Sequence, residues 1–256
     1  YQTRLFDRQG SRISLTESGN LLLEHCERIL EDYKRLEYEM HLLHNEYTGG
    51  LKLGASTTIA QYVLPPLLAS FIGKFPQVSL SLLNGNSREI EAALQEHRID
   101  LGFVEGVFRL PNIRYTTFLE DELVAVVRTG SKLAVGEEIT PDELFHLPLV
   151  LRERGSGTLD VFERALQQHN IKLSSLQVLM YLGSTESIKL FLEHTDCLGI
   201  VSVRSITREL YSGQLRVVEI KGMPMLRDFS FAQPQGQESG LAQVFMQFAM
   251  HNNHKL

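Results

Sequence analysis

Apolar residues near the start of the chain follow a seven-residue repeat. Between residues 16 and 47 the sequence has no proline, and successive apolar positions are separated alternately by four and three residues. This alternation aligns one apolar stripe along a helix and is typical of a coiled-coil seam. The seam residues are Leu22, Cys26, Ile29, Tyr33, Leu36, Met40 and Leu43. The pattern predicts a helix from residue 16 to about residue 47, roughly 45 Å long, which Thr48-Gly49-Gly50 ends. The stripe could also pack on the globular part of the same chain, but its length favours dimerisation with an identical helix.

After Gly50 the pattern changes to short apolar strands that alternate with amphipathic helices. Strands are predicted over 51–55, 78–82 and 100–104, with helices between them, which implies right-handed crossovers and a largely parallel sheet. A second unit begins near residues 123–127. Its strands are predicted near 149–151, 177–181, 200–203 and 216–220, its helices near 159–168, 185–194 and 203–211, and a last helix over 241–250. The sequence therefore predicts an α/β protein with two lobes.

Composition and charge narrow the class of protein. The chain has 256 residues, 43% of them apolar, and its net charge of −6 provides no overall basic field for nucleic acid or anionic lipid. Two cysteines, Cys26 and Cys197, form no disulfide framework and suit a reducing compartment. No apolar run reaches the roughly 18–20 residues of a transmembrane helix, and the amino terminus lacks the pattern of a signal peptide. We expect a cytoplasmic protein without a membrane partner. Because position 1 is not Met, we also expect the chain to begin inside a longer protein.

Small hydroxyl residues gather where predicted strands give way to helices. Ligands of open α/β sheets bind at such junctions, where helix starts offer free amide donors and a modest preference for anions. Each junction taken alone has the composition of an ordinary helix cap. Four of them, divided between the two lobes, favour a cleft for a small and anionic molecule. The candidate residues are Ser56, Thr57 and Thr58, then Asn86 and Ser87, then Ser156 and Thr158, then Gly183 and Ser184.

Catalytic and cofactor motifs do not occur in the sequence. The loop at residues 155–158 has neither the spacing of a phosphate-binding loop nor that of a dinucleotide fingerprint, and no nucleophile elbow or metal-binding pattern occurs. Glu105, at a strand end, is the one defensible acid–base candidate, and a loop surface charge is the simpler interpretation. Arg152 and Arg154 have the pattern of surface charges, and their roles stay open, as does that of Cys197. We expect no enzyme, no cofactor and no metal.

Six short motifs follow one another along the chain. In chain order they are Leu5-Phe6-Asp7-Arg8, Leu15-Thr16-Glu17-Ser18-Gly19, the segment 50–56, Asp100-Leu101-Gly102, the segment 152–158 and Leu198-Gly199-Ile200-Val201. Their order resembles that of the bacterial LysR-type transcriptional regulators. The resemblance implies an effector-binding domain like the type 2 periplasmic binding proteins, with strands crossing between the lobes near 121–127 and 226–231. The implied domain limits are a winged helix-turn-helix remnant over 1–15, the linker helix over 16–50, lobe I over 51–125 and 227–256, and lobe II over 126–226.

The resemblance also implies a function. A small effector would bind between the lobes, at the nine junction residues named above together with Glu105, and change how a homodimer or homotetramer sits on promoter DNA. The principal DNA-binding helices of the family are absent from this chain, and Arg204 stands where many relatives have proline. The alternatives are a solute-binding receptor of the same fold and, third, a small-molecule enzyme. Effector identity, target genes, activation or repression, and dimer or tetramer are left open.

Overall fold

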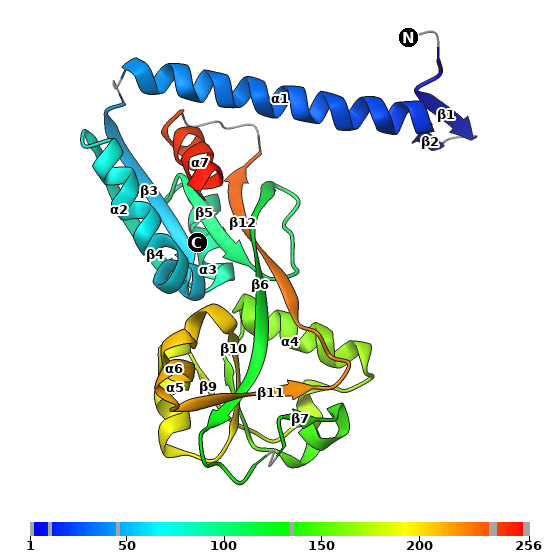
Figure 1. Ribbon diagram of the computed structural model, residues 1–256, viewed down its shortest axis with the longest axis vertical. Coiled ribbons are helices and arrows are strands. Elements are labelled where there is room, and N and C mark those ends of the chain that lie inside the picture. The colour runs from blue at the N-terminus through cyan, green and yellow to red at the C-terminus, as the bar shows by residue number, and fades with distance from the viewer. Residues whose placement is uncertain (1–2, 10–11, 45–46, 134–135, 236–239, 253–256) are drawn as a thin grey trace. The chain divides into compact units, whose positions relative to one another are not determined.

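The computed structural model consists of two compact units, residues 1–47 and 48–256, each described here by itself (Figure 1). No helix among the described residues is both long and apolar enough to cross a membrane. The structure describes residues 3–9, 12–44, 47–133, 136–235 and 240–252.

The first unit is a β-hairpin followed by one long helix. Strands β1 (Phe6–Gln9) and β2 (Arg12–Leu15) pair antiparallel, and helix α1 covers Glu17–His44. The Thr16 hydroxyl accepts the backbone N–H of Gly19 at 3.0 Å and so caps the start of α1. The linker region assigned to residues 16–50 is therefore not helical to its end: as the break predicted at residues 48–50 indicates, Gly49 has a φ of +121° and begins a strand.

The predicted seam lies along α1. Within the first unit Ile29, Tyr33, Leu36 and Met40 are each more than half exposed, at 65%, 56%, 55% and 51%. Cys26 is exposed as well, and Leu22 is half-buried. The side chain of Leu43 lies outside the described part of the helix. An exposed apolar stripe of this length is what a partner helix would cover.

The first lobe of the second unit is a mixed sheet in the order β4-β3-β5-β12-β6. Its parallel strands pair as predicted for strand–helix–strand units, whereas β12 runs antiparallel to both β5 and β6. Phenylalanine rings from the strands and covering helices fill its core, among them Phe71, Phe103 and Phe245. The elements are β3 (Gly49–Ser56), η1 (Ile59–Val63), α2 (Leu64–Lys74), β4 (Val78–Gly85), α3 (Ser87–Gln95), β5 (Leu101–Glu105), β6 (Ile113–Arg128), β12 (Leu226–Pro234) and α7 (Gly240–Asn252).

The second lobe is built on a sheet that shares β6 with the first. Its strand order is β7-β11-β6-β10-β8-β9, and helices α4 and α5 pack against its apolar core. The elements are β7 (Glu138–Ile139), η2 (Pro141–His146), β8 (Leu149–Arg152), α4 (Gly157–Gln168), η3 (Leu173–Ser175), β9 (Val178–Leu182), α5 (Thr185–His194), β10 (Leu198–Ser202), η4 (Val203–Ser205), α6 (Thr207–Ser212) and β11 (Leu215–Ile220).

Strand β6 joins the two lobes. Up to Glu122 it pairs with β12, and from Leu123 onward it pairs with β10 and β11 (Figure 1). The chain returns to the first lobe through β12, which begins beside Glu122. The polar residues of these two strands therefore lie at the level where the lobes meet.

Three local features differ from the sequence prediction. The first half of β6 was not expected to be a strand, and the helix predicted near 203–211 is split into the short turns η4 and α6. The helix after Thr58 begins with the π-helical turn η1 before α2 continues it. Each difference involves hydrogen bonds to the chain beyond the local segment, such as that from the Arg204 guanidinium to the Glu120 carbonyl.

Candidate functional site

The two lobes touch where β5 ends and α4 begins. Gly157, the first residue of α4, lies so close to Glu105 that a Cβ atom at this position would overlap the Glu105 backbone carbonyl. Ser87, at the start of α3, holds the same backbone from the other side, because its hydroxyl donates to the Glu105 carbonyl at 2.8 Å and accepts its N–H at 3.3 Å. The end of β5 is thus fixed between helix starts of both lobes.

Gly157→Ala is expected to lower the free energy of unfolding by about 1–3 kcal/mol, because the added methyl group forces the lobes apart at this contact. Gly183→Ala is the matched control, since a Cβ there meets no atom within 4 Å; its expected effect is below about 0.5 kcal/mol. Thermal or urea denaturation of both variants measures the difference. Equal stability of the two variants would show that the Gly157 contact does not hold the lobes.

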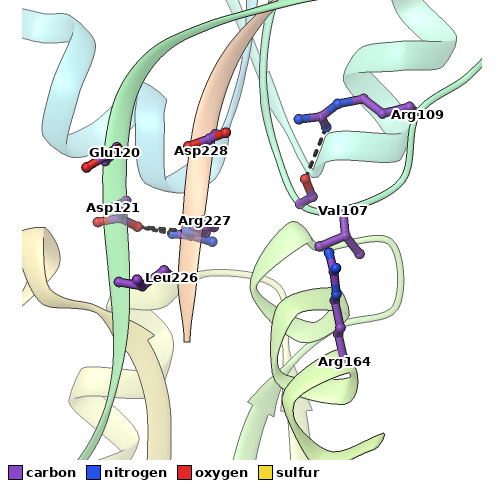
Figure 2. A pocket seen from close by; sticks show the side chains of 9 residues that line it. Val107, Arg109, Glu120, Asp121, Arg164, Leu226, Arg227 and Asp228 are labelled. Carbon is purple, nitrogen blue, oxygen red and sulfur yellow. Dashed lines mark hydrogen bonds and ion pairs between the residues drawn. The ribbon is translucent and has the colours of Figure 1, made fainter. Parts of the chain in front are cut away.

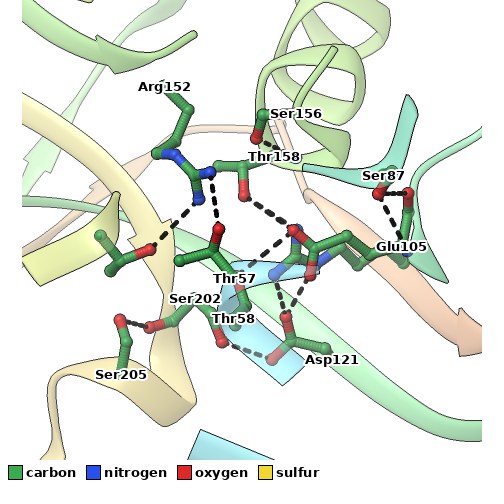
Figure 3. A network of polar contacts seen from close by, with 12 residues as sticks. Thr57, Thr58, Ser87, Glu105, Asp121, Arg152, Ser156, Thr158, Ser202 and Ser205 are labelled. Atoms are coloured by element: carbon green, nitrogen blue, oxygen red, sulfur yellow. Dashed lines mark hydrogen bonds and ion pairs between the residues drawn. The ribbon is translucent and has the colours of Figure 1, made fainter. Parts of the chain in front are cut away.

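The Glu105 side chain is the centre of a buried polar network (Figure 3). Its Oε1 accepts hydrogen bonds from the Thr58 hydroxyl of the first lobe at 3.3 Å and from the Thr158 hydroxyl of the second lobe at 3.4 Å. Arg227 Nη1, from the crossing strand β12, lies 3.1 Å from the same oxygen. Oε2 is buried and has no hydrogen-bond partner among the described residues. One carboxylate oxygen therefore collects donors from both lobes and from a strand that connects them.

Asp121 holds the other side of the Arg227 guanidinium. Nε and Nη2 of Arg227 both lie 2.7 Å from Asp121 Oδ2, and the two side chains are fully buried. Asp121 Oδ1 accepts the Ser202 hydroxyl at 2.7 Å and lies 3.6 Å from Arg204 Nε. Arg227 Nη1 also donates to the Thr158 hydroxyl at 3.0 Å. Such a cluster is tolerated in a protein interior only because each charge faces a partner of opposite sign.

Arg152, at the end of β8, is buried, so its interpretation as a surface charge was wrong. Its Nη2 donates to the Thr57 hydroxyl at 3.3 Å (Figure 3). Nη2 also lies 3.4 Å from the Gly183 carbonyl, and Nη1 reaches the Thr185 hydroxyl at 3.5 Å. Glu153 pairs with Arg152 from the partly exposed side, with Nε and Oε2 2.8 Å apart. Arg152 is thus a second cation that contacts both lobes, whereas Arg154 is exposed.

Three of the remaining predicted residues cap helices, and Gly183 contacts Arg152. Asn86, Ser156 and Ser184 accept backbone N–H groups at the starts of α3, α4 and α5, as ordinary helix caps do. Gly183 contributes its carbonyl to Arg152. Ser56 is buried, and its hydroxyl has no hydrogen-bond partner among the described residues. The interpretation of Glu105 as a loop surface charge was wrong, since the residue is 4% exposed.

A second polar contact joins the lobes beside this network. The Tyr62 hydroxyl, from η1, donates to Glu186 on α5, and burial followed by this hydrogen bond raises the pKa of Tyr62 above its ordinary value. Lys189, which is buried, lies 2.8 Å from both Glu186 Oε1 and Glu209 Oε1. The Tyr62 contact therefore joins η1 of the first lobe to α5 of the second lobe.

A cavity of about 330 Å³ lies beside the crossing strands (Figure 2). Arg109, Arg164 and Arg227 face it together with Glu120 and Asp228. Its charges are mixed, and of its three arginines Arg227 is the buried one, already paired with Asp121.

The network has donors suited to an oxyanion. Hydroxyl groups and guanidinium groups are the side chains that bind carboxylate, sulfate or phosphate oxygens. Among the described residues no cluster of three or more His, Cys, Asp or Glu side chains could hold a metal ion. Burial, with Asp196 nearby, raises the pKa of the Cys197 thiol to about 11, so this residue is not a thiolate nucleophile near neutral pH.

Sequence reasoning missed Arg227, Asp121 and Ser202. Local sequence did not distinguish them, because Asp121 lies between Glu120 and Glu122 and Arg227 is followed by Asp228, so Asp121 and Arg227 both have the pattern of exposed charged positions. Their pairing with each other depends on the register of β12 against β6, in which Arg227 lies opposite Asp121.

Comparisons with known proteins agree with this architecture. The family model of the LysR substrate binding domain matches residues 44–253. The uncharacterized HTH-type transcriptional regulator YeiE of Escherichia coli strain K12 is 35% identical over 217 residues, which cover 85% of this chain and 71% of the relative. The RuBisCO operon transcriptional regulator of Acidithiobacillus ferrooxidans is 29% identical, covering 95% of this chain and 78% of the relative.

A solved structure has the same fold. The regulatory domain of CcmR from Synechocystis PCC6803, in complex with 2-PG, is 28% identical, with a TM-score of 0.72, and the match covers 80% of this chain and 97% of that domain. These relatives are transcriptional regulators, which supports the interpretation of this chain as part of a transcriptional regulator over its interpretation as a solute-binding receptor. The chain therefore belongs to the LysR family of transcriptional regulators and contains the two-lobed effector-binding domain of that family.

Proposed function

We propose that this chain senses a small oxyanion at the junction of its lobes and thereby controls promoter binding of the full regulator. The observation that carries the proposal is the convergence of Thr58, Thr158 and Arg227 on one carboxylate oxygen. These donors come from the first lobe, the second lobe and the strand between them. A ligand held by all three would couple its binding to the angle between the lobes.

The proposed effector site retains all ten residues predicted from the sequence and adds Arg152 and Arg227. The three capping residues contribute by fixing the helix starts, from which the backbone N–H groups and neighbouring hydroxyls face the junction. The CcmR regulatory domain was solved with 2-PG, and this supports a small organic or inorganic anion as the class of ligand. The role is binding rather than catalysis, and no cofactor is required.

The proposed regulatory step is a change of lobe geometry passed to a homodimer or homotetramer. We propose that residues 1–15 end the winged helix-turn-helix domain, that 16–50 form the dimerising linker, and that 51–125 with 227–256 and 126–226 form the two lobes. Exposed apolar residues on the second lobe support further contacts between copies, among them Leu179, Met180 and Leu190. Promoter DNA would be bound in the cytoplasm, through the preceding DNA-binding domain of the parent protein.

A thermal-shift screen with small anions and a paired threonine variant test the proposal. The panel contains sulfate, amino acids, aromatic carboxylates, phosphorylated sugars and central metabolites. A ligand at 100 times its Kd stabilises the wild type by about 2.7 kcal/mol. In the double variant Thr58→Ala and Thr158→Ala we expect this stabilisation to disappear while the oligomeric state is unchanged, because only ligand donors are removed.

The matched control is Thr116→Ala with Thr207→Ala, which removes one exposed threonine from each lobe. It should respond to the panel as the wild type does. Undiminished ligand affinity in the Thr58 and Thr158 variant would refute the assignment of the site.

A further inference from the structure

The surroundings of Glu105 Oε1 are those of a bound anion. The oxygen accepts two hydroxyl groups, one from each lobe, and lies 3.1 Å from the guanidinium of Arg227. The side chain is 1% exposed, so this carboxylate is enclosed by its partners and not by solvent. These are the same donors that the proposed effector would use. The protein's own carboxylate therefore occupies the position of the ligand.

The charge balance makes Glu105 the exchangeable member of the cluster. Two nitrogens of Arg227 lie 2.7 Å from Asp121 Oδ2. The other oxygen of Asp121, Oδ1, accepts the Ser202 hydroxyl and lies near Arg204. Glu105 shares Arg227 as its charged partner, and its second oxygen is buried without a hydrogen bond among the described residues. A buried acceptor without a donor destabilises the state that contains it. Of the two carboxylates, Glu105 is the one with the incomplete set of partners.

We propose that Glu105 is an internal ligand of the effector site, and that a small oxyanion binds by exchanging with its carboxylate for Thr58, Thr158 and Arg227. This inference rests on the function proposed above and specifies its chemistry. An anion that arrived beside a retained Glu105 would be held next to a like charge in a buried site, which is unfavourable. Exchange removes that repulsion, because the side chain turns away while its backbone stays bound to Ser87.

Exchange also gives the domain a defined state without ligand. Without ligand, Glu105 of the first lobe links the lobes through its contacts with Thr158 and Arg227. The effector replaces the Glu105 carboxylate with an anion of different size and shape. The change of lobe geometry comes from the difference in size and shape between the Glu105 carboxylate and the bound anion. The affinity of the site for the anion is lower than its donors alone would provide, because the Glu105 carboxylate competes with the anion for the same donors.

The experiment measures sulfate binding by isothermal titration calorimetry at constant ionic strength, using the whole chain. The variants are Glu105→Gln, Glu105→Ala and the control Glu122→Gln, which removes the same charge from an exposed position of β6 next to Asp121. Sulfate is the probe because it has no charge other than that of the oxyanion. We expect Kd for sulfate to fall at least tenfold in both Glu105 variants and to stay within about twofold of the wild type in Glu122→Gln. Circular dichroism of each variant verifies that it is folded.

An unchanged or weaker affinity in the folded Glu105 variants would overturn the exchange. Loss of binding in these variants, when the wild type binds sulfate, would mean that Glu105 recognises the ligand directly. Absence of sulfate binding in every variant would also overturn it, since an emptied site should accept the probe. The proposed function is judged separately: a panel ligand that stabilises the wild type, but not the Thr58 and Thr158 variant, supports a sensor even where the exchange fails.

Discussion

Arg227→Ala is expected to lower the free energy of unfolding by about 3–5 kcal/mol, more than any other single change to this network. The substitution leaves the carboxylates of Glu105 and Asp121 buried without the guanidinium that lies between them. It also removes a donor to the Thr158 hydroxyl. Desolvated charges without a partner are costly because neither water nor protein dipoles replace the lost interaction. Urea denaturation of the whole chain measures the loss.

A surface ion pair supplies the matched control for this variant. Arg128 Nε lies 2.8 Å from Asp196 Oδ1, but the two side chains are 37% and 41% exposed. Arg128→Ala should therefore change the free energy of unfolding by less than about 1 kcal/mol. A triple variant with Arg227→Met, Glu105→Gln and Asp121→Asn should recover part of the stability, because it removes the unpaired charges. A loss in Arg227→Ala no larger than in Arg128→Ala would contradict the importance of the buried cluster.

The second large effect concerns the linker helix. The double variant Ile29→Glu and Leu36→Glu is expected to abolish association through α1 and to sediment at half the mass of the wild type. Both residues lie on the seam, and both are exposed within the first unit, at 65% and 55%. In a dimer four buried apolar side chains would be replaced by carboxylates. At about 1.5–3 kcal/mol for each lost side chain, the dissociation constant should rise at least 10³-fold.

Leu30→Glu tests whether position on the seam decides this outcome. Leu30 is 57% exposed, nearly the same as Leu36, but it is one residue away from the stripe. The control should retain the mass of the wild type in sedimentation velocity at the same concentrations. If the seam variant also keeps that mass, α1 does not dimerise through the predicted stripe.

Local patterns predicted most of the elements of this chain. The strands β3, β8 and β10 and the helices α4 and α5 lie within a few residues of their predicted positions, since the alternation of apolar side chains depends only on spacing along one segment. The long helix and its exposed stripe follow from the same rule. The hydroxyl-rich junctions were found because strand ends and helix starts can be recognised locally.

The candidate site could be predicted only in part. Thr57, Thr58, Glu105 and Thr158 are in the network as side-chain partners, whereas the oxygens of Asn86, Ser156 and Ser184 are used by their own helices. A cap and a ligand donor have the same residue type and the same position in the sequence. Whether a hydroxyl caps its own helix or contacts a ligand depends on which side chains of the other lobe lie close to it.

The sequence by itself determined the periodic elements, the two-lobed α/β fold and the family, because each of these is set by spacing and by motifs within short segments. Only the tertiary structure decided that Arg152 and Glu105 are buried and that Arg227 stands between two carboxylates. Burial of a charge depends on the element that covers it, and here the pairing of β12 with β6 and the approach of Gly157 to Glu105 provide that cover. Contacts between residues so distant along the chain have no signature in local periodicity.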